Sequence, residues 1–123
     1  MTRVIVAGSR NFTDKEKLYK VLDNRLASIK DNVEIISGHC RGADMLGEQY
    51  AKEHGIPLVL FPADWDRYGK RAGYIRNDKM ARYASKKDGI LIAFPVGEAR
   101  GTKMMIRIAH SYGLETDVNY ALG

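Results

Sequence analysis

Short apolar runs recur along this chain of 123 residues, and each is followed by a segment with helical spacing. Uninterrupted apolar runs are typical of parallel strands that are covered on both faces. Strands that alternate with helices imply a parallel sheet wrapped by helices through right-handed crossovers. The sequence therefore predicts a single α/β, Rossmann-like three-layer domain over residues 1–123, with a parallel sheet of about five strands. The expected strands are Thr2–Ala7, Val33–Ser37, Pro57–Phe61, Asp88–Phe94 and a weaker Glu115–Asn119.

The segments between these runs carry helix signals. Thr13 and Glu16 have the spacing of a capping box, which predicts that the first helix has Thr13 as its N-cap. Apolar residues at helical spacing predict later helices over about Tyr74–Ser85 and from Met104 to Tyr112. The least regular segment is Pro62–Gly73, for which no regular element is expected.

Three of the expected strands end in loops that contain glycine. Ligands of open parallel sheets bind beyond the carboxyl ends of the strands, where the strand order reverses. Glycine lets a phosphate approach the backbone N–H groups, and a helix that starts after the loop adds partial positive charge. One such loop is an ordinary turn, but three on one edge predict a pocket for a phosphorylated ligand. The loops are Gly8–Arg10, Ser37–Asp44 and Gly97–Thr102.

The expected binding residues come from these loops, from the segment that leads into the Tyr74–Ser85 helix and from the start of that helix. Glycines would allow close approach, hydroxyl groups would donate hydrogen bonds, and arginines would pair with phosphate. The predicted set is Gly8, Ser9, Arg10, Ser37, Gly38, Arg41, Gly42, Ala43, Asp44, Asp64, Trp65, Arg76, Asn77, Gly97, Glu98, Gly101 and Thr102. No catalytic residue is established by the sequence, and Asp44 and Glu98 are the candidates.

Some of these residues have a structural alternative that the sequence leaves open. Asp44 could orient Arg41 or accept a ribose hydroxyl, or it could only interact with the dipole of its helix. Trp65 and Tyr68 lie among basic residues and could stack on a base. Alternatively, they could be partly buried anchors of a long loop, a role that fits Tyr68 better than Trp65.

Composition excludes several classes of protein. Hydrophobic residues make up 45% and charged residues 28%, as in a globular chain and unlike a disordered one. No apolar run approaches the roughly 20 residues of a membrane-spanning helix, and no secretory signal is visible, so a cytoplasmic protein is expected. Cys40 is the sole cysteine, and the histidines show no metal-ligand spacing. We therefore expect no disulfide within the chain, no metal site and no cofactor.

The charge balance points to an anionic partner without choosing one. The formal net charge is +5 and the sequence pI is near 9.4. Both nucleotides and nucleic acids fit such a balance. Because the lysines are scattered, a nucleic acid is the less favoured partner, and no membrane partner is expected.

Five motifs follow one another in the order Val4–Arg10, Ser37–Asp44, Phe61–Trp65, Ile75–Asn77 and Gly97–Thr102. Together they resemble the YspA-like branch of the SLOG superfamily, which is named for the DNA-processing DprA/Smf and the cytokinin-activating LOG proteins. The resemblance implies a Rossmann-like domain that binds a nucleotide or a nucleotide-derived ligand at the strand ends. LOG-type hydrolases carry a catalytic glutamate three residues after the threonine of the last motif, where this sequence has Met105. A methionine cannot stabilise an oxocarbenium ion, so the departure puts the same hydrolysis in doubt.

The favoured hypothesis is a sensor or sequestering module that binds an adenine nucleotide or an ADP-ribose-like compound. A second hypothesis is a nucleotide-processing hydrolase that cleaves an N-glycosidic bond, with Glu98, Asp44 or Asp64 as the acid/base group and Arg41 or Arg76 on the phosphate. A third is single-stranded DNA binding, as in the DprA branch. The apolar cluster Met104, Met105 and Ile108 also leaves a homodimer open.

Overall fold

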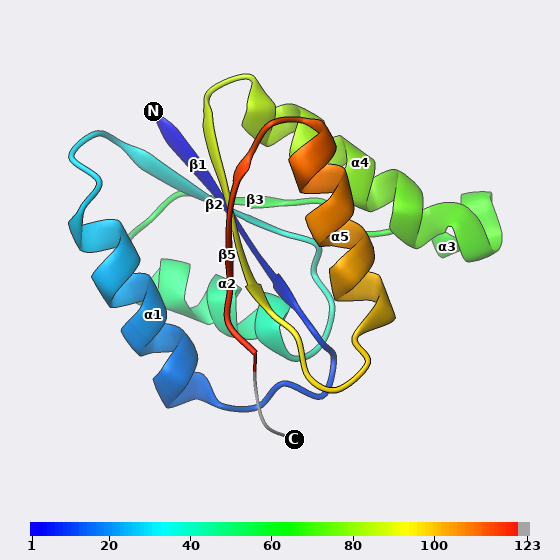
Figure 1. Ribbon diagram of the computed structural model, residues 1–123, viewed down its shortest axis with the longest axis horizontal. Helices are drawn as coiled ribbons and strands as arrows, with labels where there is room; N and C mark the ends of the chain where they lie inside the picture. The colour runs from blue at the N-terminus through cyan, green and yellow to red at the C-terminus, as the bar shows by residue number, and fades with distance from the viewer. Residues whose placement is uncertain (121–123) are drawn as a thin grey trace.

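The computed structural model describes residues 1–120, which form a five-stranded sheet with all neighbouring strands parallel. The strands lie in the order β3-β2-β1-β4-β5 (Figure 1). This Rossmann-like α/β arrangement confirms the fold class that the apolar runs predict. The strands are β1 (Thr2–Gly8), β2 (Val33–Ser37), β3 (Leu58–Leu60), β4 (Asp88–Phe94) and β5 (Glu115–Val118).

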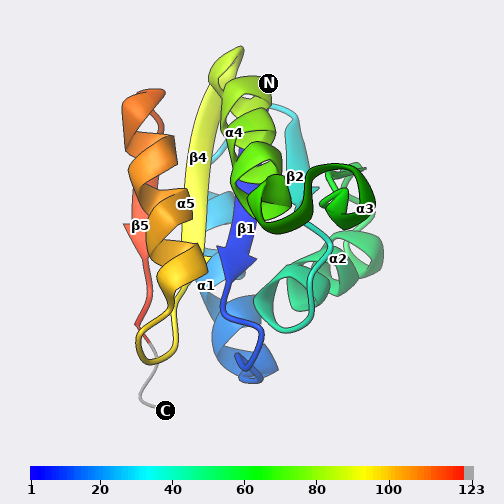
Figure 2. The ribbon, with the colours of Figure 1, turned by 90° about the vertical axis from the view of Figure 1, so that its right-hand side faces the viewer.

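Helices cover both faces of the sheet. One face carries α1 (Lys15–Ala27) and α2 (Ala43–Glu53), and the other carries α4 (Ala72–Ser85) and α5 (Arg100–Ser111) (Figure 1). Figure 2 shows α4 and α5 side by side in front of the strands. No helix within residues 1–120 is long and apolar enough to cross a membrane.

The central strand β1 contributes to two separate hydrophobic cores. Val4 and Val6 pack in the core beneath α1 and α2, whereas Ile5 and Ala7 pack in the core beneath α4 and α5. Successive side chains of a strand point to opposite faces, so a strand covered on both sides must be apolar at every position. This requirement explains why β1 reads as an uninterrupted apolar run.

The start of the first helix differs from the prediction by one residue. The N-cap is Asp14 and not Thr13, because the Asp14 carboxylate accepts a hydrogen bond from the backbone N–H of Lys17 at 3.1 Å. An aspartate caps as well as a threonine, and its position allows α1 to begin at Lys15. The capping-box prediction was therefore wrong at this site.

The segment before α4 is more regular than expected. It forms a short helix, α3 (Trp65–Tyr68), followed by a 3-10 turn over Gly69–Arg71 that leads into α4. Asp64 supplies the reason, since its carboxylate accepts from the Arg67 N–H at 3.2 Å and caps α3. The segment thus forms a helical arm at one side of the domain (Figure 1).

The apolar residues of α5 that left a homodimer open are used inside the subunit. Met105 and Ile108 are 1% and 8% exposed and belong to the core beneath α4 and α5. Met104 is half-buried and lines a cavity between these helices. These three side chains therefore do not form an apolar outer surface.

Candidate functional site: a cavity at the carboxyl edge of the sheet

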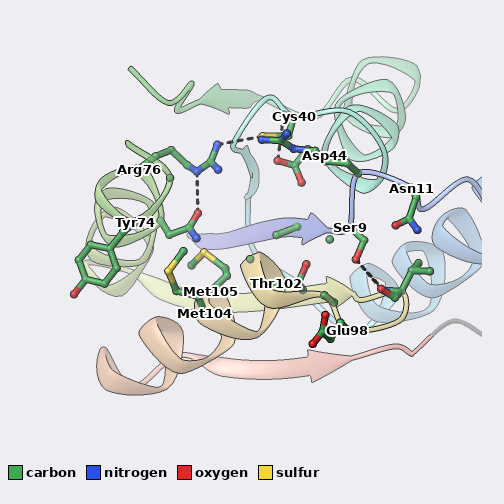
Figure 3. A pocket seen from close by; sticks show the side chains of 18 of the residues that line it. Ser9, Asn11, Cys40, Asp44, Tyr74, Arg76, Glu98, Thr102, Met104 and Met105 are labelled. Atoms are coloured by element: carbon green, nitrogen blue, oxygen red, sulfur yellow. Dashed lines mark hydrogen bonds between the residues drawn. The ribbon is translucent and has the colours of Figure 1, made fainter. Parts of the chain in front are cut away.

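A cavity of about 710 Å³ opens at the carboxyl ends of β1 and β4. After β1 the chain leads to α1 on one face, and after β4 it leads to α5 on the other, so the cavity lies where the strand order reverses. The loops after β1, β2 and β4 contribute to its wall together with α3 and α4 (Figure 3). Its volume is in the range of small-molecule sites, roughly 300–1,000 Å³.

Ser9 joins the three loops to one another. Its hydroxyl oxygen accepts from the Val96 N–H at 2.9 Å, and its own N–H donates to the Phe94 carbonyl at 3.2 Å. On the other side, a Cβ at Gly42 would lie 2.3 Å from the Ser9 carbonyl oxygen, and Gly42 has a φ of +80°. Only glycine combines this backbone conformation with such close packing. The loops after β1, β2 and β4 are therefore locked together at this edge of the sheet.

Three polar side chains that line the cavity are nine-tenths buried. Asp44 is 5% exposed, and Asn77 and Thr102 are each 6% exposed. They come from three different helices, α2, α4 and α5. Figure 3 shows Asp44 and Thr102 on opposite sides of the middle of the cavity. Because polar groups are costly to bury in an apolar setting, their convergence on one cavity is suited to a polar ligand.

Arg76 is held by neutral acceptors. Its Nε donates to the Asn77 Oδ1 at 2.8 Å, and its Nη1 donates to the Gly38 carbonyl at 2.7 Å and contacts the Cys40 sulfur at 3.5 Å. Within residues 1–120 it makes no ion pair with a carboxylate. Its orientation is thus fixed while its charge remains available to a polar or charged group of a ligand in the cavity.

The carboxyl group of Asp44 has an unusual environment. Burial raises its pKa from 3.8 to about 6, against the opposing effects of the Cys40 N–H, the Arg76 charge and the Gly8 N–H. The Cys40 N–H lies 3.3 Å from the Asp44 Oδ2. A carboxyl with a pKa near neutrality in a cavity is a group that can exchange a proton or accept a ligand hydroxyl.

The two ends of the cavity differ in chemistry (Figure 3). One end holds Ser9, Asn11 and the start of α5, whereas the other holds Tyr74, Met104 and Met105. At the first end, α5 has no side-chain cap, since its N-cap is Ala99 in a left-handed conformation with a φ of +50°. The free N–H groups of its first turn favour a negative charge there.

Comparison with known proteins assigns the family. A family profile described as "YspA, cpYpsA-related SLOG family" matches residues 2–68, which run from β1 to the end of α3. This chain belongs to that SLOG family. The resemblance seen in the motifs is confirmed, and membership in this SLOG family suggests a nucleotide-related ligand-binding module.

A relative of this SLOG domain is the "Gene 61 protein" of Mycobacterium phage D29. The two chains are 31% identical over 119 residues, which cover 93% of each. The similarity therefore extends beyond the matched residues 2–68 and includes the α4 and α5 walls of the cavity. No solved structure gave a significant match.

The structure brings most of the predicted residues to the cavity of this SLOG domain. The lining set is Gly8, Ser9, Arg10, Asp44, Trp65, Arg76, Asn77, Gly97, Glu98, Gly101 and Thr102. Four others lie behind the wall, where they support the loops: Ser37, Gly38, Gly42 and Ala43.

Arg41 and Asp64 lie outside the cavity lining. Arg41 is exposed on the loop after β2, so Arg76 rather than Arg41 supplies the cation in this part of the wall. Asp64 serves as the cap of α3. Glu98 lies at the rim, where it makes an exposed 3.5 Å ion pair with Arg100. Exposed ion pairs of this kind contribute little to stability. Glu98 is therefore a solvent-exposed carboxylate, whereas Asp44 is buried.

Sequence reasoning missed a buried network behind the loop after β2. Glu48 is buried, accepts from the Ser37 hydroxyl at 2.7 Å and lies 2.9 Å from the Nδ1 of His39. This network positions the loop that carries Cys40 into the cavity wall. The available signal was spacing, since Glu48 follows Asp44 by four residues and shares its helix face.

Proposed function

We propose that this domain binds a nucleotide or a nucleotide-derived ligand, such as an adenine nucleotide or an ADP-ribose-like compound, as a sensor or sequestering module. The anionic group would lie against the loops after β1 and β4 and the first turn of α5. Asp44, Asn77 and Thr102 would hydrogen-bond the polar middle of the ligand.

One observation carries this proposal. Asp44, Asn77 and Thr102 are nine-tenths buried and come from three helices, yet all three line the same cavity, beside the uncapped start of α5. A ligand with several hydrogen-bonding groups and a negative charge complements this arrangement. Family membership points to the same class of ligand.

Calorimetric titration of the purified protein with AMP, ADP, ADP-ribose, NAD and a cyclic dinucleotide tests the proposal. Replacing Arg76 by alanine should weaken binding at least about tenfold, because a hydrogen bond to a charged group contributes about 1.5–3 kcal/mol. Arg41→Ala is the matched control, since Arg41 is exposed and lies off the lining. Circular dichroism checks that both variants are folded. If none of the five compounds binds, the proposal fails and a nucleic-acid or protein partner takes its place.

Hydrolysis of the bound ligand is a second candidate function. The observation that favours it is the buried Asp44 carboxyl, whose pKa of about 6 suits an acid/base group. Against it stands Met105, at the position where LOG-type hydrolases carry a catalytic glutamate. Incubation with each binding compound, followed by chromatography for free base, decides between the two. Free base that forms with the wild type and not with Asp44→Asn would establish turnover.

A further inference from the structure

The end of the cavity formed by α3 and α4 carries two aromatic side chains with open faces. Trp65 and Tyr74 are 49% and 55% exposed, and both line the cavity. Within residues 1–120, neither ring pairs with another ring or with a cation. Tyr68 on the same arm is different, because Arg67 and Lys79 lie against its ring and it lines a separate, smaller cavity.

Methionines form the floor of this end. Met80, from α4, lines the cavity together with Met104 and Met105 from α5. Figure 3 shows the last two side by side. Met80 and Met105 are each 1% exposed, so the core holds the floor in place. Polarizable thioether sulfur makes favourable contacts with aromatic rings. The floor thus suits a flat, apolar ring better than a hydrated sugar or phosphate.

Gly73 leaves space beside Trp65. A Cβ at Gly73 would lie 3.6 Å from the Cη2 of the Trp65 indole and 4.0 Å from the Nη2 of Arg76. The indole edge and the guanidinium group therefore flank a position that no side chain of residue 73 occupies. Both groups are planar and both stack on heteroaromatic rings.

We propose that this end of the cavity is a stacking subsite for the heteroaromatic base of the ligand. Trp65 and Tyr74 supply the stacking faces, and the methionines supply the floor. The base lies at the α4 end while the anionic group lies at the start of α5, so a sugar phosphate without a base fills only part of the cavity. The inference rests on the proposed function and adds to it that the base itself is recognised.

Trp65 is the sole tryptophan of the chain, so tryptophan fluorescence reports directly on this end of the cavity. We expect ADP to quench the tryptophan fluorescence of the wild-type protein and ribose 5-phosphate to leave it unchanged. In calorimetry, ADP should bind about tenfold or more tightly than ribose 5-phosphate, because stacking contributes about 1–3 kcal/mol per base.

Three variants complete the test. Trp65→Ala and Tyr74→Ala should each weaken ADP about tenfold and leave ribose 5-phosphate unaffected, since both residues are half-exposed and their loss leaves the core intact. Tyr68→Ala is the matched control and should change neither affinity. If ADP binds without quenching and both cavity variants bind it like the wild type, the stacking subsite is refuted while the proposed function stands. If ribose 5-phosphate binds as tightly as ADP, the subsite is refuted as well. If neither compound nor any other nucleotide binds, the proposed function itself fails.

Discussion

The guanidinium of Arg76 and the carboxyl of Asp44 both border Gly38, which has no side chain to fill the space between them. A Cβ at Gly38 would lie 2.6 Å from the Arg76 Nη1 and 3.0 Å from the Asp44 Oδ2. A cation and a buried carboxyl from two different helices are thereby placed together in one wall of the cavity.

The methyl group of a Gly38→Ala variant should displace Arg76 from this position. We expect nucleotide affinity to fall at least about tenfold, because an oriented charged hydrogen bond contributes about 1.5–3 kcal/mol. The fold should survive, since the crowded atoms are ends of side chains. Calorimetry and thermal melting measure both effects. In an Arg76→Ala background the same substitution should cost little affinity, and an undiminished loss there would show that the methyl acts through another group.

The ionised carboxylate of Asp44 should lower the free energy of unfolding at neutral pH. Its pKa is about 6 in the folded protein against an ordinary 3.8, so its ionisation costs the folded state about 3 kcal/mol. A raised pKa stabilises the fold when the carboxyl is protonated, and that stabilisation is lost as the pH rises through about 6. Asp44→Asn should therefore be more stable than the wild type at pH 7.5 by about 2–3 kcal/mol and no more stable near pH 3.5. Urea unfolding at the two pH values tests the sign.

The exposed Asp66→Asn variant is the control for this pH series. It should change stability little at either pH. The Asp44 interpretation is wrong if Asp44→Asn shows the same stability difference at both pH values.

Gly101→Ala separates a ligand-binding role from a structural one. Nothing lies within 4 Å of a Cβ placed at Gly101, which is in the first turn of α5 and lines the cavity. The variant should melt at the same or a higher temperature, since alanine is favoured over glycine in a helix by about 1 kcal/mol. Nucleotide affinity should nevertheless fall, because the methyl occupies the approach to the free N–H groups. An unchanged affinity would show that the anionic group of the ligand does not bind at the start of α5.

A cluster at the amino ends of the strands, away from the cavity, should affect the stability of the fold but not nucleotide binding. Arg3 lies 3.7 Å from the centre of the Tyr83 ring, donates from its Nη1 to the Tyr83 carbonyl at 2.7 Å and pairs with Glu34 at 3.1 Å. Because these groups are mostly buried, Arg3→Ala should cost about 2–4 kcal/mol. Chemical unfolding measures the loss, and calorimetry should give the wild-type nucleotide affinity for the folded variant. A change in that affinity would show that the Arg3 cluster influences ligand binding in the cavity.

The sheet could be predicted because its strands are covered on both faces, which forces uninterrupted apolar runs onto β1 and β4. The cavity could be placed for a related reason, since parallel strands bring their glycine loops to one edge. Asp44 was found on that basis, whereas Arg76 was predicted from its place at the start of the helix that follows Pro62–Gly73.

Other features depend on geometry that the sequence does not carry. Arg41 and Asp44 belong to the same loop motif, but the turn at Gly42, with its φ of +80°, separates an exposed arginine from a buried carboxylate. Met104 and Met105 were expected only as part of an apolar cluster that left a homodimer open. Met105 is buried, yet both methionines line the cavity, because α4 and α5 leave a gap at the strand ends that periodicity cannot reveal.

The central position of β1 has a consequence for how the chain folds during its synthesis. β1 is made first, but Thr2 pairs with Asp88 along one of its edges, so that edge has no partner until β4 is translated. Exposed strand edges are the sites at which nascent chains pair wrongly and aggregate. Pairing across so long a stretch is also slow. A chain that stalls on the ribosome before residue 88 would leave one edge of its central strand unpaired and its second core open, and it would lack the part of the cavity wall that the loop after β4 and α5 supply.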